Sequence, residues 1–385
     1  MSAYALSEQQ QMLADSVKAY LGRRPAAASA TDALGAVGTQ RWSEMAALGW
    51  LALPVPEAWG GLSGSMSDIC ALTEEMGKAA VNEPYIASAV LAGMLLAEVA
   101  PPQIQQDWLP ALAQGSKRLA LAAWEPDARF DWTQIKTCAF PEGAQWRLEG
   151  SKVTVLGGPQ ADALLLSARL SGSSDLALFL LPVGGPGQTL QPQTLLDGQT
   201  CAELTLKDAR GAVLLSCGEG PRVLARLEAA LDRASLAHCA DTVGAMTQVF
   251  MLTREYLGTR SQFGKPIAAN QVVQHRLVDL FVEIEEARAL MRKTARLHDA
   301  EGSDAARVWA HHVAATKAFV AQVARHVWEE AVQLHGAIGM TQEYAVGAYV
   351  KRLALAVSLY GDATFHLERL AAASLKAPAS SSHAG

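Results

Sequence analysis

The sequence lacks the cysteine spacing that marks disulfide-bonded or zinc-binding domains. Its cysteines are odd in number, scattered and never spaced Cys-x-x-Cys, and they stand at Cys70, Cys138, Cys201, Cys217 and Cys239. This pattern argues against a disulfide framework and against a zinc knuckle. His311 and His312 are adjacent rather than spaced like metal ligands on one helix face, so no metal site is expected. A reducing cytoplasm is the compartment that fits best.

Long apolar runs and basic segments are lacking as well. The longest apolar run, residues 86–100, is short and contains Glu98, and Glu8 and Asp15 stand where an export signal would be basic and then apolar. We therefore expect neither a membrane span nor export. The formal net charge of -6 comes without a basic stripe, which makes nucleic acid and acidic membrane surfaces poor candidates for partners.

The chain does have enough apolar residues for a sizeable core. Of its 385 residues, 50% are hydrophobic and 18% charged, as in a folded protein of two or three domains. Residues 1–118 show helical spacing, 119–221 show short alternating segments between Gly, Ser and Pro clusters, and 222–376 return to helical spacing. We expect an α+β protein with an N-terminal all-α domain, a middle antiparallel β domain and a C-terminal four-helix bundle. The small polar residues 377–385 are expected to be disordered.

Five segments make this expectation specific. Apolar residues at alternating steps of four and three predict a bundle helix over 273–291, and an Ala- and Leu-rich helix is expected over 85–99. In the β domain, residues 149–151 signal a turn and residues 153–156 are typical of a strand. The acidic residues within 283–288 are expected to form a solvated helix face.

Two motifs in the last third of the chain are the most informative. Residues 253–274 form a charged turn, broken by Gly and Pro, between two long amphipathic helices, and the Gly-rich segment 331–344 follows. These motifs resemble the two C-terminal signatures of the acyl-CoA dehydrogenase family, in the right order. The succession of helical, β and helical parts is similar to that family too, so the resemblance covers nearly the whole chain.

The resemblance implies a reaction and its partners. In the family a carboxylate removes the α-proton of an acyl-CoA thioester, FAD takes the β-hydride to leave a trans-2-enoyl-CoA, and electron-transfer flavoprotein accepts the electrons. Residues 83–85 and 359–364 most resemble the smaller subunits of two-gene members, of the pimeloyl-CoA and steroid-degrading types. A dicarboxylyl, alicyclic or steroid-derived acyl group is implied. The implied assembly is a homotetramer or a heterotetramer with a homologous subunit.

The resemblance also implies cofactor-binding residues. Six of them match positions that hold the FAD of a neighbouring subunit in relatives: Arg260, Phe263, Gln271, Gln333, Gly336 and Gly339. Arg260 would offer a permanently charged fork to the pyrophosphate, and the glycines lack the Cβ that would block a close approach of backbone. Taken alone, Arg260 would be interpreted as a cation at a helix C-terminus and the glycines as a helix-ending loop.

The candidate base is Asp362, which aligns with the catalytic glutamate of many relatives. Aspartate is shorter by roughly 1.5 Å, and a misplacement near 1 Å costs about a hundredfold in rate. The alternative is that Asp362 N-caps the helix that follows. Thr364 and His366 align with positions near the flavin, although His366 also fits a helix surface. The second base position of the family aligns with Ala234, and nearby Asp232 is not assigned a role.

Several departures from the family fall in the flavin pocket. Residues 124–131 replace a segment that offers hydroxyl and backbone donors to the flavin ring, and 154–156 replace the Trp-Ile-Thr strand that covers it. Ser235 stands where relatives have an arginine. Contacts to the isoalloxazine are therefore expected to be weaker.

Three functions stay open at this point. The first, which the signatures favour, is a dehydrogenase subunit that binds FAD, oxidises an acyl-CoA and passes the electrons to electron-transfer flavoprotein. The second is a degenerate subunit that completes the FAD site of a partner in a heterotetramer while its own pocket is idle. The third is a flavoenzyme of the acyl-CoA oxidase type, with oxygen as the electron acceptor.

Overall fold

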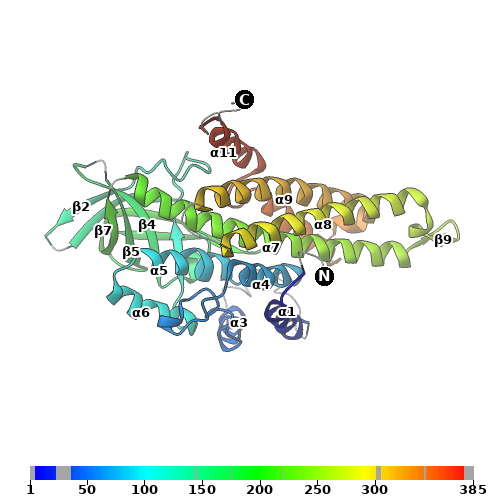
Figure 1. Ribbon diagram of the computed structural model, residues 1–385, viewed down its shortest axis with the longest axis horizontal. Coiled ribbons are helices and arrows are strands. Elements are labelled where there is room, and N and C mark those ends of the chain that lie inside the picture. Colours follow the sequence, from blue (N-terminus) through cyan, green and yellow to red (C-terminus); the bar gives the residue numbers. More distant parts are fainter. Residues whose placement is uncertain are drawn as a thin grey trace, which may run out of the picture.

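The computed structural model describes residues 5–22, 36–143, 145–173, 175–218, 220–300, 305–341 and 344–376. It contains helices, then a sheet, then long helices, which confirms the expected fold class (Figure 1). The limits of the domains stay a prediction, and the tail at 377–385 lies outside the described residues. Among the helices that are described, none is both long and apolar enough to cross a membrane.

The N-terminal part is helical, as the spacing predicts. Its helices are α1 (Glu8–Leu21), α3 (Ala36–Ala47), η1 (Glu57–Trp59), α4 (Met66–Lys78), η2 (Ile86–Gly93), α5 (Met94–Val99) and α6 (Pro102–Ala113). Ser7 and Ser65 close capping boxes at the starts of α1 and α4. The helix expected over 85–99 is one continuous segment, but its first half, η2, has the wider winding of a π-helix, a winding that often occurs beside functional sites.

The middle part is a seven-stranded sheet in the order β1-β4-β2-β3-β7-β5, with β6 added to β7 and β4 also paired with β5. Its strands are β1 (Leu119–Ala122), β2 (Cys138–Glu142), β3 (Gln145–Lys152), β4 (Ala163–Leu170), β5 (Leu176–Pro182), β6 (Gln188–Thr194) and β7 (Thr200–Gly218). The sheet is mixed rather than purely antiparallel, because β1 and β2 both run parallel to β4. Residues 123–162 connect β1 to its parallel neighbour β4 and include β2 and β3, so this connection exceeds the roughly a dozen residues that a parallel crossover needs.

Two local expectations in this sheet are wrong. Residues 149–151 lie inside β3 at a bulge, where the register against β7 shifts. A Cβ on Gly150 would lie 2.8 Å from the Cα of Thr137, so the strand passes the neighbouring loop only as glycine. Residues 153–156 are not a strand, since β3 ends at Lys152 and Thr154 has a left-handed φ of 52°.

The C-terminal part is a bundle of long helices: α7 (Gly220–Thr259), α8 (Gln271–Asp299), α9 (Ala305–His335), α10 (Val346–Ala356) and α11 (Ala363–Lys376). The expected stripe on α8 is confirmed, because Leu280, Ile284, Ala287 and Met291 are buried. Figure 1 shows α7, α8 and α9 running along the long axis, with the sheet at one end and the turn that contains β9 at the other. This turn projects from the body of the molecule.

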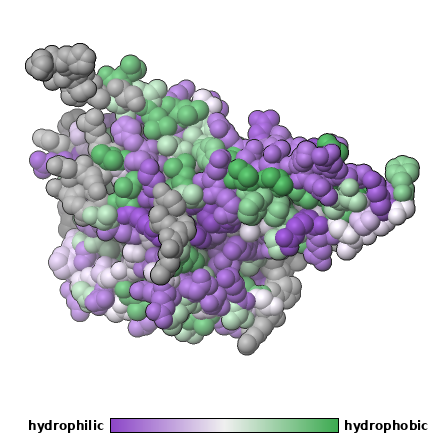
Figure 2. All heavy atoms as spheres, turned by 45° about the vertical axis from the view of Figure 1, so that its right-hand side comes forward, coloured by the Kyte–Doolittle hydropathy of each residue, from purple (hydrophilic) through white to green (hydrophobic). Residues whose placement is uncertain are grey.

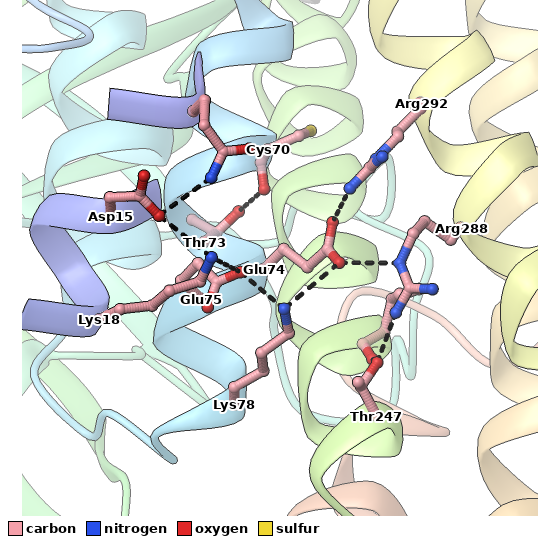
Figure 3. Close-up of polar contacts among 12 residues, drawn as sticks. Asp15, Lys18, Cys70, Thr73, Glu74, Glu75, Lys78, Thr247, Arg288 and Arg292 are labelled. Carbon is pink, nitrogen blue, oxygen red and sulfur yellow. Dashed lines mark hydrogen bonds and ion pairs between the residues drawn. The ribbon is translucent and has the colours of Figure 1, made fainter. Parts of the chain in front are cut away.

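A buried glutamate joins the N-terminal helices to the bundle (Figure 3). Glu74 of α4 accepts hydrogen bonds from Arg288 Nε at 2.8 Å and from Arg292 Nη2 at 3.0 Å. Arg288 also donates to Thr247 Oγ1 on α7 at 2.6 Å. Although burial opposes ionisation, the two arginines hold the pKa of the Glu74 carboxyl below its usual value. The network fixes α4 against α7 and α8.

Candidate functional site

A small buried cavity lies where the N-terminal helices, the sheet and the bundle meet. It measures about 40 Å³. Its lining comes from α4, from residues 81–87, from the loop after β3, from the start of β7, and from α7, α10 and the loop that follows α10. Among the described residues, three lining side chains have a buried polar atom without a hydrogen-bond partner: Glu83 Oε1, Tyr85 Oη and His238 Nδ1. A polar cavity of this size holds about one or two water molecules.

One wall of the cavity is an ion pair that sequence reasoning missed. Arg352 of α10 is buried and donates to both carboxylate oxygens of Asp241 on α7, at 3.0 and 2.7 Å. Its guanidinium also donates to Asn82 Oδ1 at 3.1 Å and to the Val81 carbonyl at 2.9 Å. These partners belong to the N-terminal part and to the helical bundle, so the ion pair fixes the two parts against each other at this wall of the cavity. The sequence feature that could have revealed this ion pair is the position of Arg352 next to Leu353, on the apolar side of α10.

Aromatic side chains pack together where the two segments that the resemblance puts around the flavin ring meet. The two segments expected around that ring, 124–131 and 154–156, do lie together, since the Val153 N–H donates to the Trp124 carbonyl at 2.9 Å. Trp124 and Tyr360 are both buried, and their rings meet edge-on with centroids 6.2 Å apart. Trp124, from the first of these segments, therefore packs against another side chain of the same protein.

The same packing continues toward α11. The ring of Trp132 meets that of Phe365 edge-on, with centroids 5.4 Å apart, and the ring centroids of Phe130 and Phe365 lie 5.7 Å apart. Pockets for ligands of the size of a flavin ring typically measure ~300 Å³ or more. The 40 Å³ cavity, which Leu156 and Tyr360 line, has no room for an isoalloxazine ring.

The loop between α10 and α11 is held in an unusual conformation over the cavity. Tyr360 and Gly361 have left-handed φ values of 60° and 104°, and a Cβ on Gly361 would lie 2.5 Å from Phe365 Cδ1. His366 is buried beneath this turn, and its Nε2 bonds the Tyr360 carbonyl at 2.9 Å. Burial lowers the pKa of His366 to about 3, so the imidazole is neutral and donates this bond. His366 is therefore not a surface residue.

Asp362 follows directly and caps the next helix. Its Oδ1 accepts the Phe365 N–H at 2.8 Å, which is the geometry of an N-cap for α11. The side chain is half-buried and does not line the 40 Å³ cavity, and Thr364 is exposed on the first turn of the helix. The capping alternative is thus what the structure shows, while the role of Asp362 as a base stays a prediction.

The other residues considered near the base lie on α7. Ala234 is fully buried and offers no acid or base. Asp232 is buried in an ion pair with Arg369 of α11, with N···O distances of 2.9 and 3.1 Å. Burial raises the pKa of Asp232 to about 6. Ser235, aligned with an arginine in relatives, is buried, and among the described residues its Oγ has no hydrogen-bond partner.

A larger hollow opens beside this ion pair. It measures about 560 Å³ and lies between α7, α9 and α11. Half of its lining residues are alanine, and Trp309 and Leu370 add apolar surface. Arg369, which also lines it, bonds Glu228 at 2.8 Å. The positive charge of Arg369 is therefore matched by two carboxylates.

The first signature forms the projecting turn between α7 and α8. Strands β8 (Ser261–Gln262) and β9 (Lys265–Pro266) pair across Phe263 and Gly264, which have left-handed φ values of 52° and 79°. The side chain of Phe263 is 100% exposed, and Arg260 and Gln271 at the two helix ends are exposed as well. All three side chains are available to another molecule.

The second signature lies beside this turn. Gln333 and Gly336 are exposed at the end of α9 and the start of η5 (Gly336–Met340). Gly339 is buried, and a Cβ there would lie 2.9 Å from the Cβ of His335. His335 stacks on Tyr256 of α7 with centroids 4.7 Å apart, one turn before Arg260. The structure thus brings the two signatures together on one surface.

This surface is remote from the cavity. On α7, the cavity is lined by His238 and Asp241, whereas the helix ends at Thr259. At 1.5 Å per residue, the 18 positions between Asp241 and Thr259 span about 27 Å. The signature residues and the cavity of one chain therefore belong to separate ends of the molecule.

The chain is similar to known proteins over most of its length. Residues 7–116 match the family model of the acyl-CoA dehydrogenase N-terminal domain, and residues 224–375 match that of the acyl-CoA dehydrogenase C-terminal domain. Acyl-CoA dehydrogenase FadE12 of Mycobacterium tuberculosis is 30% identical over 325 residues, which make up 83% of each chain.

Solved structures are similar to the chain as well. The Tcur3481–Tcur3483 steroid ACAD is 27% identical with a TM-score of 0.83, and the match covers 96% of this chain and 98% of that one. A chain of the ChsE4–ChsE5 complex from Mycobacterium tuberculosis is 24% identical with a TM-score of 0.81, covering 98% of this chain and all of that one, which shows the shared fold alone.

Proposed function

The chain belongs to the acyl-CoA dehydrogenase family, and from this premise we propose that it is a subunit that completes the FAD site of a homologous partner. The partner would seat the flavin ring and the acyl-CoA, and the assembly would be a heterotetramer. When bound there, FAD supplies the acceptor for the β-hydride of the acyl-CoA. The chain's own contribution is to hold the far end of the cofactor.

The closed junction is the observation that carries this proposal. The cavity between the sheet and the bundle measures about 40 Å³, and Trp124 packs against Tyr360, one of its lining residues. Asp362 is engaged as a helix cap. A working dehydrogenase needs room for the flavin and the acyl-CoA and a carboxylate aimed between them, and a 40 Å³ cavity with a helix-capping Asp362 supports the partner as the place of both.

The exposed turn supplies the other half of the argument. Arg260 has a planar, permanently charged group suited to two phosphates, and the exposed ring of Phe263 can cover an adenosine or an apolar part of the partner. Gln271 and Gln333 add amide donors on the same surface. Gly336, with a φ of 64° and no neighbour near its missing Cβ, leaves the backbone open to close approach.

The acyl group and the electron acceptor that we propose are those that the resemblance to the family implies. We propose a dicarboxylyl, alicyclic or steroid-derived acyl-CoA, and the likeness to a steroid ACAD supports the last of these. Electron-transfer flavoprotein is the proposed acceptor, and the cytoplasm is the proposed compartment.

A self-sufficient dehydrogenase is the second candidate. It is favoured by the position of Asp362, whose carboxylate is half-buried in the loop that closes the cavity. In this case the chain would bind FAD itself and form a homotetramer, and Asp362 would act as the base after a movement of the loop. The two candidates differ in where the flavin is bound.

The test uses the complex of this chain with a homologous family member, to be sought first among the neighbouring genes. Arg260→Ala is expected to weaken FAD binding by that complex by roughly tenfold or more, because a charged hydrogen bond contributes ~1.5–3 kcal/mol. The matched control is Arg222→Ala, an exposed arginine at the opposite end of the same helix, which should leave FAD binding unchanged. Equal FAD retention and equal dye reduction by both variants would contradict the proposal.

A further inference from the structure

The signature turn, residues 260–270 between α7 and α8, stands at the end of an arm. Figure 2 shows this arm projecting from the body of the molecule, with hydrophobic atoms at its tip. The backbone ties the turn to Tyr256, because the Arg260 N–H donates to the Tyr256 carbonyl at 2.8 Å. The N–H of Ile267, at the start of η4 (Ile267–Ala269), donates to the Arg260 carbonyl at 2.9 Å. A shift of Tyr256 is therefore passed on to Arg260.

Three rings pack together at this end of α7, and His335 is one of them. The imidazole of His335, the last residue of α9, stacks on Tyr256 with an angle of 20° between the ring planes. The ring centroid of Tyr344 lies 5.2 Å from that of His335 and 5.8 Å from that of Tyr256. His335 is buried. The three rings join the ends of α7 and α9 to the segment before α10.

The hydrogen of the His335 ring is fixed on one nitrogen. Nδ1 lies 2.8 Å from the Ala331 carbonyl, and because a carbonyl only accepts, Nδ1 carries the hydrogen. Nε2 is buried and, in the part of the chain that the structure describes, has no hydrogen-bond partner. A proton on Nε2 would be a buried donor without an acceptor, which is unfavourable. Burial accordingly lowers the pKa of His335.

The other titratable side chains at these rings come from α7 and from the segment before α10. They are the Tyr256 and Tyr344 phenols and the Glu255 carboxylate. Burial, together with Glu255, raises the pKa of the Tyr344 phenol, so this ring stays neutral below about pH 10. Among these groups, a histidine is the one whose charge changes in mildly acidic solution.

We propose that neutral His335 is a positioning residue, whose ring holds Tyr256 and thereby fixes Arg260 in place for the FAD of the partner. The inference rests on the proposed function, which assigns Arg260 to that cofactor. Loss of the ring, or a proton on Nε2, frees the end of α7. The expected consequence is weaker FAD binding.

The test measures the FAD affinity of the complex with the homologous partner. His335→Ala removes the ring and should weaken FAD binding roughly five- to tenfold at neutral pH. His335→Phe keeps a ring against Tyr256 and should stay within about threefold of the wild type. Between about pH 7 and pH 5, the wild type should lose about threefold more affinity than His335→Phe, because phenylalanine takes up no proton.

His312→Phe is the matched control for the acid effect. Burial also lowers the pKa of His312, and this residue lies on the same helix, about 35 Å from His335 at 1.5 Å per residue. The control should keep the wild-type pH profile of FAD binding.

Two outcomes would overturn the inference: full FAD affinity in His335→Ala, or the same acid loss in His335→Phe as in the wild type. If His335→Ala does not fold, the pH profile of His335→Phe decides. Arg260→Ala separates this failure from that of the proposed function. Weak FAD binding in Arg260→Ala beside full affinity in His335→Ala would remove the inference alone, whereas full affinity in Arg260→Ala would remove both.

Discussion

Asp362 is the residue on which the catalytic role of the chain depends. Its hydrogen bond with the Phe365 N–H accounts for its position at the start of α11, and asparagine can make the same bond. Asp362→Asn should therefore leave both the stability of the fold and the activity of the partner complex nearly unchanged. Asp362→Ala should lower the free energy of unfolding by about 1 kcal/mol. Urea unfolding and dye reduction measure the two quantities, and loss of activity in Asp362→Asn would restore the residue as a base.

His366 makes stability sensitive to acid. Its pKa is about 3 in the folded chain against a usual value of 6.5, with burial as the main cause. The unfolded chain therefore binds the proton first as pH falls, so stability is full above about pH 6.5 and is lost toward pH 3. Between pH 7 and pH 4.5 this residue should account for a loss of about 2 kcal/mol.

His366→Gln isolates this effect. The amide can still donate to the Tyr360 carbonyl but does not titrate. The free energy of unfolding in urea should consequently fall less for the variant than for the wild type between these two pH values. An equal fall in both proteins would show that other groups, such as buried His238, dominate the acid response.

At the scale of elements, two glycines set how closely α4 and α7 approach. A Cβ on Gly244 would lie 1.8 Å from the Glu74 carbonyl oxygen, and one on Gly77 would lie 1.9 Å from the Asp241 carbonyl oxygen. Gly244→Ala must push α4 away from α7, and the cost should reach about 3 kcal/mol, as for an overpacked core.

The same helix offers the matched control. Gly258 has nothing within 4 Å of its missing Cβ, so Gly258→Ala should be neutral or stabilising by up to about 1 kcal/mol, because alanine favours helix. Thermal or urea unfolding of the two variants compares them directly. A Gly244→Ala protein as stable as the wild type would mean that the two helices can separate without cost.

The elements also show what sequence can and cannot predict here. The bundle helix over 273–291 follows from its spacing, because one face of a long helix must be apolar to be buried. The bulge at Gly150 does not follow, since it depends on the loop at Thr137 against which β3 passes. The parallel pairing of β1 and β2 with β4 likewise depends on a crossover that leaves no local pattern.

At the scale of the whole molecule, one part of the candidate site could be predicted from the sequence and another part could not. The signature turn was found from its motif, because the exposed residues of a partner-directed loop are close together in sequence. The closed cavity was not found, because Trp124, His238 and Tyr360 meet from three parts of the chain more than a hundred residues apart. Substitutions in the flavin pocket indicated weaker contacts, but only the packing shows that Trp124 and Tyr360 contact each other.

The most direct test of this account is the flavin content of the chain purified alone and passed through gel filtration after incubation with excess FAD. A chain whose own ring site is filled should keep close to no flavin, and should acquire it only in complex with a homologous partner. One FAD retained per chain in the absence of any partner would contradict the account and establish the chain as a self-sufficient flavoprotein.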